Sequence, residues 1–148
     1  MNIISALGAG LAGATALTVL HEVNRRIDPR APRMDLLGMN ALELIFKKAG
    51  KSVPSSNTLH KQALAADIIS NLAYYSLAGI GNKNLWTKSS LLGLGAGIGA
   101  LLLPKPMGLN PEHSNKSART QFSTVALYLV GGLVTGAVLN LIRSKQQR

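Results

Sequence analysis

The chain has 148 residues, no cysteine, a formal net charge of +10, 47% hydrophobic residues and only 15% charged residues. This composition excludes a disordered protein, and a soluble domain of this length would carry about a quarter charged residues. The lack of cysteine excludes disulfides, thiolate metal sites and a cysteine nucleophile. We therefore expect one all-α membrane domain, a helical bundle formed by residues 1–148.

Four segments are predicted to span the membrane. Residues 2–20 and 120–142 contain no charged side chain, and each is long enough to cross a hydrocarbon core of about 30 Å. The first is expected to be an uncleaved anchor, because no basic residue precedes it. Residues 63–80 include Asp67, and residues 85–103 span only if Lys88 extends toward the headgroups. Residues 81–84 predict a tight turn between these two segments.

Residues 21–62 carry too many charges to cross, but they contain a predicted amphipathic helix at residues 36–48. Asn40, Glu43 and Lys47 follow one face at i, i+3 and i+7, and apolar residues cover the rest. Asp35 is the expected N-cap. A narrow polar stripe on an apolar helix is typical of an interfacial helix, although packing on another subunit explains the pattern equally well.

The basic residues predict the orientation of the chain. The connections after the first and third predicted spans hold 11 of the 16 Lys and Arg residues. The positive-inside rule therefore places the long first loop in the cytoplasm and both termini outside. If one of the two central segments did not cross, the C-terminus would lie in the cytoplasm. The location we expect is a bacterial inner membrane.

Small residues recur at four-residue spacing in three predicted spans, which is typical of closely packed membrane helices. The glycines concerned are Gly10, Gly13, Gly93, Gly95, Gly97, Gly99, Gly132 and Gly136. The pattern favours packing against other membrane subunits, a second copy or the same chain. The spacing of Gly8, Gly10 and Gly13 resembles the dinucleotide-binding fingerprint, but the basic, Pro-containing segment after it leaves no second strand. No cofactor is expected.

Asp67, Asn71 and Tyr74 form a polar stripe at i, i+4 and i+7 in the second predicted span. An ionisable residue inside a membrane helix is a candidate for proton or cation transport. Alternatively, Asp67 is an interfacial carboxylate about one turn from the end of the span. A third hypothesis is an enzyme that uses His21, Glu22 and Asp67. The segment from His21 resembles a zinc-protease helix but lacks its second histidine, so no metal is expected.

The basic residues of the first loop can also bind anionic lipid headgroups, each contributing about 1 kcal/mol near an anionic leaflet. The candidates are Arg25, Arg26, Arg30, Arg33, Lys47 and Lys48. Nucleic acid is not an expected partner, because the charges are dispersed over several loops. The sequence favours a non-catalytic accessory or structural subunit that packs through glycine-rich faces. The alternative is a small oligomeric channel or transporter that uses the Asp67 stripe.

Overall fold

The computed structural model describes residues 2–81 and 83–146, and within these ranges the chain is helical and contains no strand. The elements are α1 (Ile3–Ile27), α2 (Met34–Lys48), α3 (Ser56–Ser76), the 3-10 helix η1 (Leu77–Gly79), α4 (Leu85–Leu102), α5 (Glu112–Asn115) and α6 (Ala118–Gln146). The all-α prediction is confirmed.

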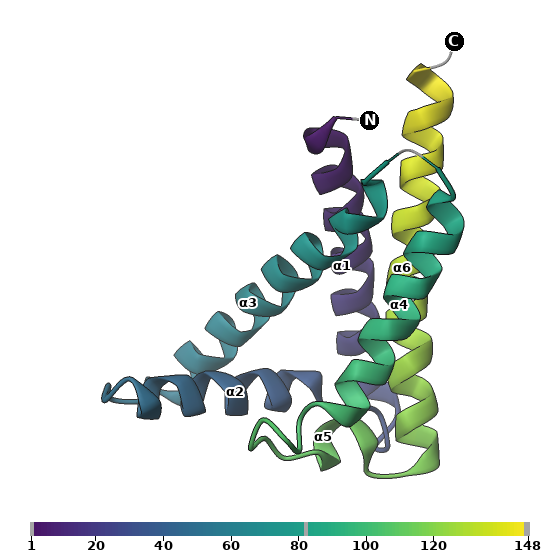
Figure 1. The fold of residues 1–148 in the computed structure, drawn as a ribbon. Helices are drawn as coiled ribbons and strands as arrows, with labels where there is room; N and C mark the ends of the chain where they lie inside the picture. Colours follow the sequence, from purple (N-terminus) through teal and green to yellow (C-terminus); the bar gives the residue numbers. More distant parts are fainter. Residues whose placement is uncertain (1, 82, 147–148) are drawn as a thin grey trace.

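The helices have two distinct directions (Figure 1). α1, α4 and α6 stand side by side, and α6 contacts both of the others. α2 lies across the lower end of α1, and α3 leans from the far end of α2 back to the upper part of α1. Both chain ends lie at the upper end, opposite α2 and α5. The two long connections therefore share one end of the molecule.

Three helices, α1, α4 and α6, are long and apolar enough to cross a membrane. They correspond to the predicted spans 2–20, 85–103 and 120–142, and they suggest a membrane location. The predicted span 63–80 lies in α3, which is not among them. α3 starts earlier than predicted, at Ser56, and carries Asp67 and Asn71 on its length. These polar residues lower its mean hydropathy.

One local prediction near the first loop was wrong, the N-cap at Asp35. α1 itself continues beyond the predicted span 2–20 to Ile27, since Glu22 forms ion pairs with Arg25 at 2.6 Å and Arg26 at 2.7 Å. Such i, i+3 and i, i+4 pairs stabilise a helix, and basic residues suit its last turn. Asp35 is not the N-cap of α2, because that position is Arg33. The Asp35 carboxylate instead accepts two hydrogen bonds from the Arg33 guanidinium.

Glycines bring the backbones of α4 and α6 into direct contact. A Cβ atom at Gly93 would lie 2.8 Å from the Tyr128 carbonyl oxygen, and one at Gly97 would lie 2.8 Å from the Cα of Val125. From the α6 side, a Cβ at Gly132 would lie 3.0 Å from the Cα of Gly93. Since these neighbours are backbone atoms, they cannot move aside as a side chain can.

Gly10 and Gly13 likewise bring the backbone of α1 close to other helices. A Cβ at Gly10 would lie 2.5 Å from the Leu72 carbonyl oxygen of α3, and one at Gly13 would lie 2.6 Å from the Gly131 carbonyl oxygen of α6. Gly136 of α6 faces Ser89 and Trp86 of α4 in the same way. Glycines therefore lie at the contacts of α4 with α6, of α1 with α6 and of α1 with α3.

Hydrogen bonds tie the first loop to the start of α6 at the lower end. The Arg119 guanidinium pairs with Asp28 at 2.8 Å, and the Thr120 hydroxyl donates to the Arg30 carbonyl oxygen at 2.9 Å. The Arg33 N–H donates to the His113 carbonyl oxygen at 2.7 Å. The backbone N–H of Arg30 and then the Arg119 guanidinium hold the pKa of Asp28 below its usual range. Asp28 is thus a link between two distant segments.

We expect Asp28→Asn to lower the melting temperature by a few degrees at neutral pH. Because the pKa of Asp28 is lower in the folded protein than in the unfolded chain, its stabilising contribution is present above its unfolded pKa of about 3.9. This contribution is lost as the pH falls through the folded pKa. Melting in detergent should show the difference between variant and wild type shrinking under acid. The control is Glu43→Gln, which removes an exposed pair with Lys47 within α2; a pH-independent difference for Asp28→Asn contradicts this prediction.

Candidate functional site

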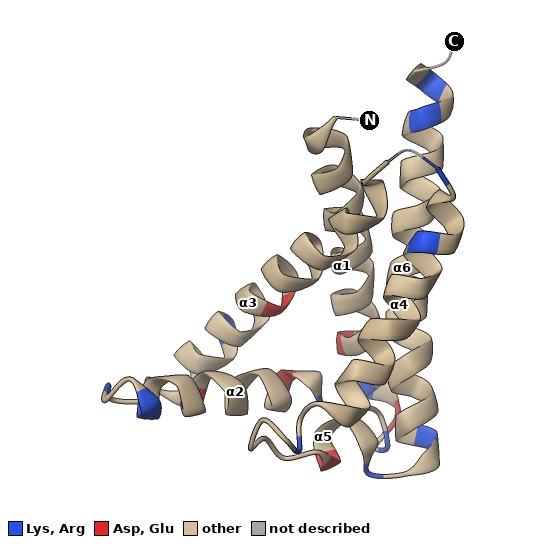
Figure 2. Ribbon diagram, in the orientation of Figure 1, with Lys and Arg blue, Asp and Glu red and all other residues tan. Residues whose placement is uncertain are grey.

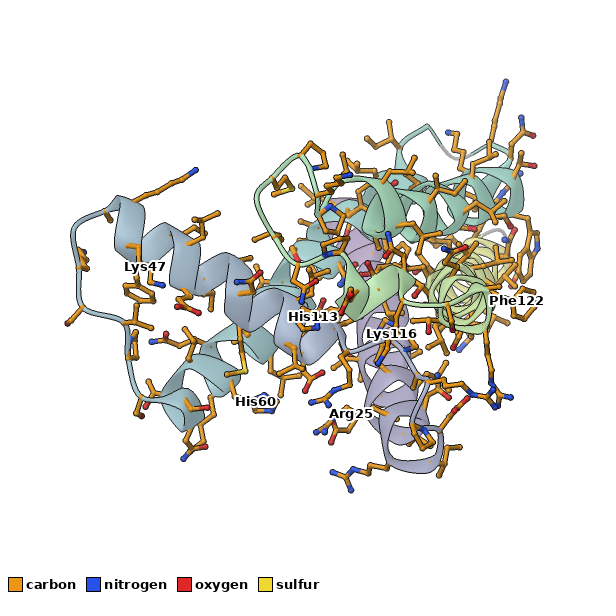
Figure 3. All side chains as sticks on the ribbon, turned by 90° about the horizontal axis from the view of Figure 1, so that it is seen from below. Arg25, Lys47, His60, His113, Lys116 and Phe122 are labelled. Carbon is orange, nitrogen blue, oxygen red and sulfur yellow. The ribbon has the colours of Figure 1, made fainter. Side chains whose placement is uncertain are left out.

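A small cavity lies between the lower half of α1, the start of α2 and the middle of α3. Its volume is about 30 Å³, which is room for about one water molecule. It is lined by Thr18, His21, Glu22, Arg25, Pro32, Met34, Asp35, His60, Ala63, Leu64 and Asp67. Figure 3, seen from below, shows Arg25 and His60 on this side of the molecule and Lys47 far from it on α2. The structure thus brings together the three residues of the enzyme hypothesis, His21, Glu22 and Asp67.

Asp67 is the acidic residue of this cavity that has no cationic partner. Its carboxylate accepts hydrogen bonds from the Thr18 hydroxyl at 3.1 Å and from the Asn71 side-chain amide at 2.9 Å. None of the six ion pairs among the described residues includes it. Because α3 begins at Ser56, Asp67 lies about three turns into the helix. The carboxylate faces α1, where it accepts the hydrogen bond from Thr18.

His21 is the feature that sequence reasoning missed. The residue is only 7% exposed. Neither ring nitrogen has a hydrogen-bond partner in the described structure, and the ring packs edge-on against Tyr128 with centroids 5.5 Å apart. The signal in the sequence is its register: His21 continues the small and apolar face of Gly10, Ala14 and Leu17, all of which are buried.

The other acidic residues at the cavity are held by arginines. Glu22 pairs with Arg25 and Arg26, and Asp35 pairs with Arg33 at 2.7 Å. Burial raises the pKa of Asp35, but the hydrogen bonds and charge of Arg33 outweigh this and leave the pKa below its usual range. Asp35 is therefore a charged structural group, whereas Asp67, His21 and His60 are titratable residues of the cavity that take no part in the ion pairs of the described residues.

The predicted polar stripe is divided between two sites. Asn71 donates to both the carbonyl oxygen and the carboxylate of Asp67. Tyr74 points toward α4, where a Cβ at Gly95 would lie 3.2 Å from the Tyr74 hydroxyl. Asn71 and Tyr74 also line a larger groove between α3 and α4, with a volume of about 490 Å³. All three stripe residues therefore face other helices of the chain.

Most of the predicted headgroup-binding residues are engaged in ion pairs. Arg25, Arg26, Arg30, Arg33 and Lys47 each pair with a nearby acid, and Lys48 is the one candidate outside the ion pairs of the described residues. Figure 2 shows acidic and basic residues gathered at the end that holds α2 and α5, whereas the opposite end shows only basic ones. Most basic residues of the first loop thus form ion pairs within the protein.

The cavity offers a carboxylate, an imidazole and a hydroxyl around space for one water molecule. Among the described residues, no three His, Asp or Glu side chains lie within reach of one metal ion. Carboxylates and imidazoles are groups that gain and lose protons near neutral pH when their surroundings favour it. Comparison of the chain with family models, curated proteins and solved structures found no match.

Proposed function

We propose that the chain is a four-crossing protein of a bacterial inner membrane, with α3 as the fourth crossing helix. α1 and α4 both run toward the end that holds α2 and α5 (Figure 1). If both cross in this direction, α3 must cross back between them. Its outer face suits lipid, since Ile69 is 65% exposed. Ile80, which follows η1 at the end of this segment, is also 65% exposed. The polar residues of α3 face inward, as membrane helices require.

The orientation and the role of α2 follow from the same arrangement. The lower end holds the two long connections with their excess of basic residues, which supports a cytoplasmic position. α2 lies across the axis of α1 at this end, where an amphipathic helix meets the headgroups. Its exposed Ile45 and its Glu43–Lys47 pair give it one apolar and one charged side.

We infer that the protein binds and transfers protons at Asp67, as part of a small proton carrier or conductor. The observation that carries this proposal is the position of Asp67, without a cationic partner among the described residues, on a water-sized cavity shared with the buried His21, whose ring nitrogens have no hydrogen-bond partner there. The proposal rests on the crossing of α3 proposed above. Intramembrane carboxylates in such positions mark proton relays. The volume of about 30 Å³ gives room for about one water molecule, which suits a proton carried on water.

The lining residues suggest how the proton moves. Thr18 and Asn71 fix the carboxylate so that it faces the cavity. Thr18 and His60 also line an open depression on the outer surface between α1 and α3, which gives water a route to the site from the lower end. A proton that arrives on water is accepted by the Asp67 carboxylate, and the His21 imidazole lines the same cavity. Asn71 and Tyr74 continue the polar line toward α4.

An accessory or structural subunit has less support from the geometry. Seven of the eight predicted glycines, all except Gly99, face another helix of the same chain. The glycine pattern therefore has an explanation that requires no partner subunit. An oligomer remains compatible with the exposed apolar faces of all four long helices.

Proton uptake into liposomes tests the proposal. The full chain is reconstituted with a pH-sensitive dye inside, and a potassium gradient with valinomycin supplies the driving force. We expect the wild type to exceed empty liposomes and Asp67→Asn to lower the flux at least tenfold. The matched control is Glu43→Gln, which makes the same change in charge on the exposed side of α2. A wild-type rate equal to that of empty liposomes, or an unchanged rate for Asp67→Asn, overturns the proposal.

A further inference from the structure

The groove between α3 and α4 is a second site, separate from the Asp67 cavity. α3 forms one wall through Ser70, Asn71 and Tyr74, and α4 forms the other. Met34 and Leu37 of α2 close its lower end together with Pro104, Met107 and Leu109. Its volume of about 490 Å³ lies within the range of about 300–1,000 Å³ typical of small-ligand sites.

The α4 wall is made from the glycine register that α6 does not use. Gly93 and Gly97 meet the backbone of α6, whereas Gly95 and Gly99 line the groove. Ala96 and Ala100 lie beside them, so this wall is free of large side chains. The nearest atom to a Cβ at Gly99 would be 3.4 Å away and belongs to Leu103 of the same helix. The groove is therefore smooth, apolar and open over about one turn of α4.

The position of the groove identifies a hydrocarbon chain as its occupant. α4 is one of the helices with the length and composition to cross a membrane, so lipid chains are the medium that meets the groove. A hydrocarbon chain fits the α4 wall, which is apolar and has only small side chains.

A basic residue lies in the connection that closes the groove, next in sequence to a lining residue. Lys105 follows Pro104 and precedes Met107, both of which line the groove. Its side chain is exposed and takes no part in the ion pairs of the described residues. The arginines of the first loop, in contrast, form ion pairs. An anionic headgroup at the cytoplasmic surface would meet Lys105 while the attached chain enters the groove.

We propose that the groove binds one anionic phospholipid, with an acyl chain against Gly95 and Gly99 and the phosphate at Lys105. The site goes beyond proton binding and rests only on the proposed membrane position of α3 and α4. It assigns different parts to the two glycine registers of α4: one packs against α6 and the other receives lipid. Failure of lipid binding would leave the proton flux unaffected, so the two proposals are tested separately.

Native mass spectrometry of the protein extracted from vesicles of phosphatidylglycerol and phosphatidylethanolamine tests the site. We expect the wild type to retain one phosphatidylglycerol and Gly99→Leu, which fills the groove, to lose most of it. The matched control is Gly8→Leu, because nothing lies within 4 Å of a Cβ at Gly8. Circular dichroism and melting verify that both variants are folded.

A second variant keeps the test independent of the fold of α4. Lys105→Gln lies on an exposed connection, and we expect it to reduce the preference for phosphatidylglycerol over phosphatidylethanolamine at least fivefold. The proposal is overturned if the wild type retains no phospholipid, if Gly99→Leu retains as much as Gly8→Leu, or if Lys105→Gln keeps the full preference. A lipid-free dimer in the same spectra would assign the groove to a second copy and overturn it as well.

Discussion

Gly132→Ala is expected to destabilise the protein by about 2–4 kcal/mol, a large fraction of the total stability of an ordinary domain. The added Cβ would lie 3.0 Å from the Cα of Gly93 and still closer to the Ser89 carbonyl oxygen. Both neighbours are backbone atoms of α4, so the variant folds only if α4 and α6 move apart. Their separation would weaken the contact along the whole length of α4.

Denaturant unfolding in detergent, followed by circular dichroism, measures this effect. Gly8→Ala is the control, because Gly8 has open space around its Cα. Alanine favours a helix over glycine by up to about 1 kcal/mol, so the control should be neutral or slightly more stable than wild type. Equal stability of Gly132→Ala and Gly8→Ala would show that the two helices do not pack at this glycine.

His21→Leu is expected to change stability and function in opposite directions. The imidazole is buried without a hydrogen-bond partner from the described residues, and an unpaired buried polar group costs about 1–3 kcal/mol. A leucine of similar size removes this cost, so we expect a gain of about 1–2 kcal/mol in the free energy of unfolding. If His21 exchanges protons with Asp67, the same variant should lower the proton flux at least tenfold.

Leu17→Ala is the matched control for this experiment. Leu17 is fully buried one turn before His21 on the same face of α1, and its truncation should cost about 2–5 kcal/mol. The measurements are denaturant unfolding and the liposome flux. A loss of stability for His21→Leu as large as that for Leu17→Ala would show that the imidazole is hydrogen-bonded in the native protein.

The sequence predicted where helices lie better than where they end. Charge-free runs mark α1, α4 and α6 because a crossing helix must be apolar along its length. The charge-free run that marks the first span ends at residue 20, and the pairs of Glu22 with Arg25 and Arg26 carry the helix beyond it to Ile27. The same criterion began the second span at residue 63, although the polar residues from Ser56 onward are helical. Helix formation tolerates charge, and membrane insertion does not.

The candidate site was only half predicted. Asp67 was found because an acid in an apolar segment is unusual, and its neighbour Asn71 followed from the helical repeat. The burial of His21 was not found, because it depends on Tyr128 of α6 and on α2 and α3, which approach α1 from distant parts of the chain. Periodicity describes one helix face and does not say what covers it.

By itself, the sequence determined the helical class, the three apolar helices and the small-residue faces, because these depend on composition and on a repeat within one segment. Only the tertiary structure decided which glycine register of α4 meets α6 and which lines the groove with Tyr74. It also decided that Asp67 meets Thr18 and lines a cavity together with His21. These outcomes depend on the angles and depths at which helices pack, and residues far apart in the chain set those jointly.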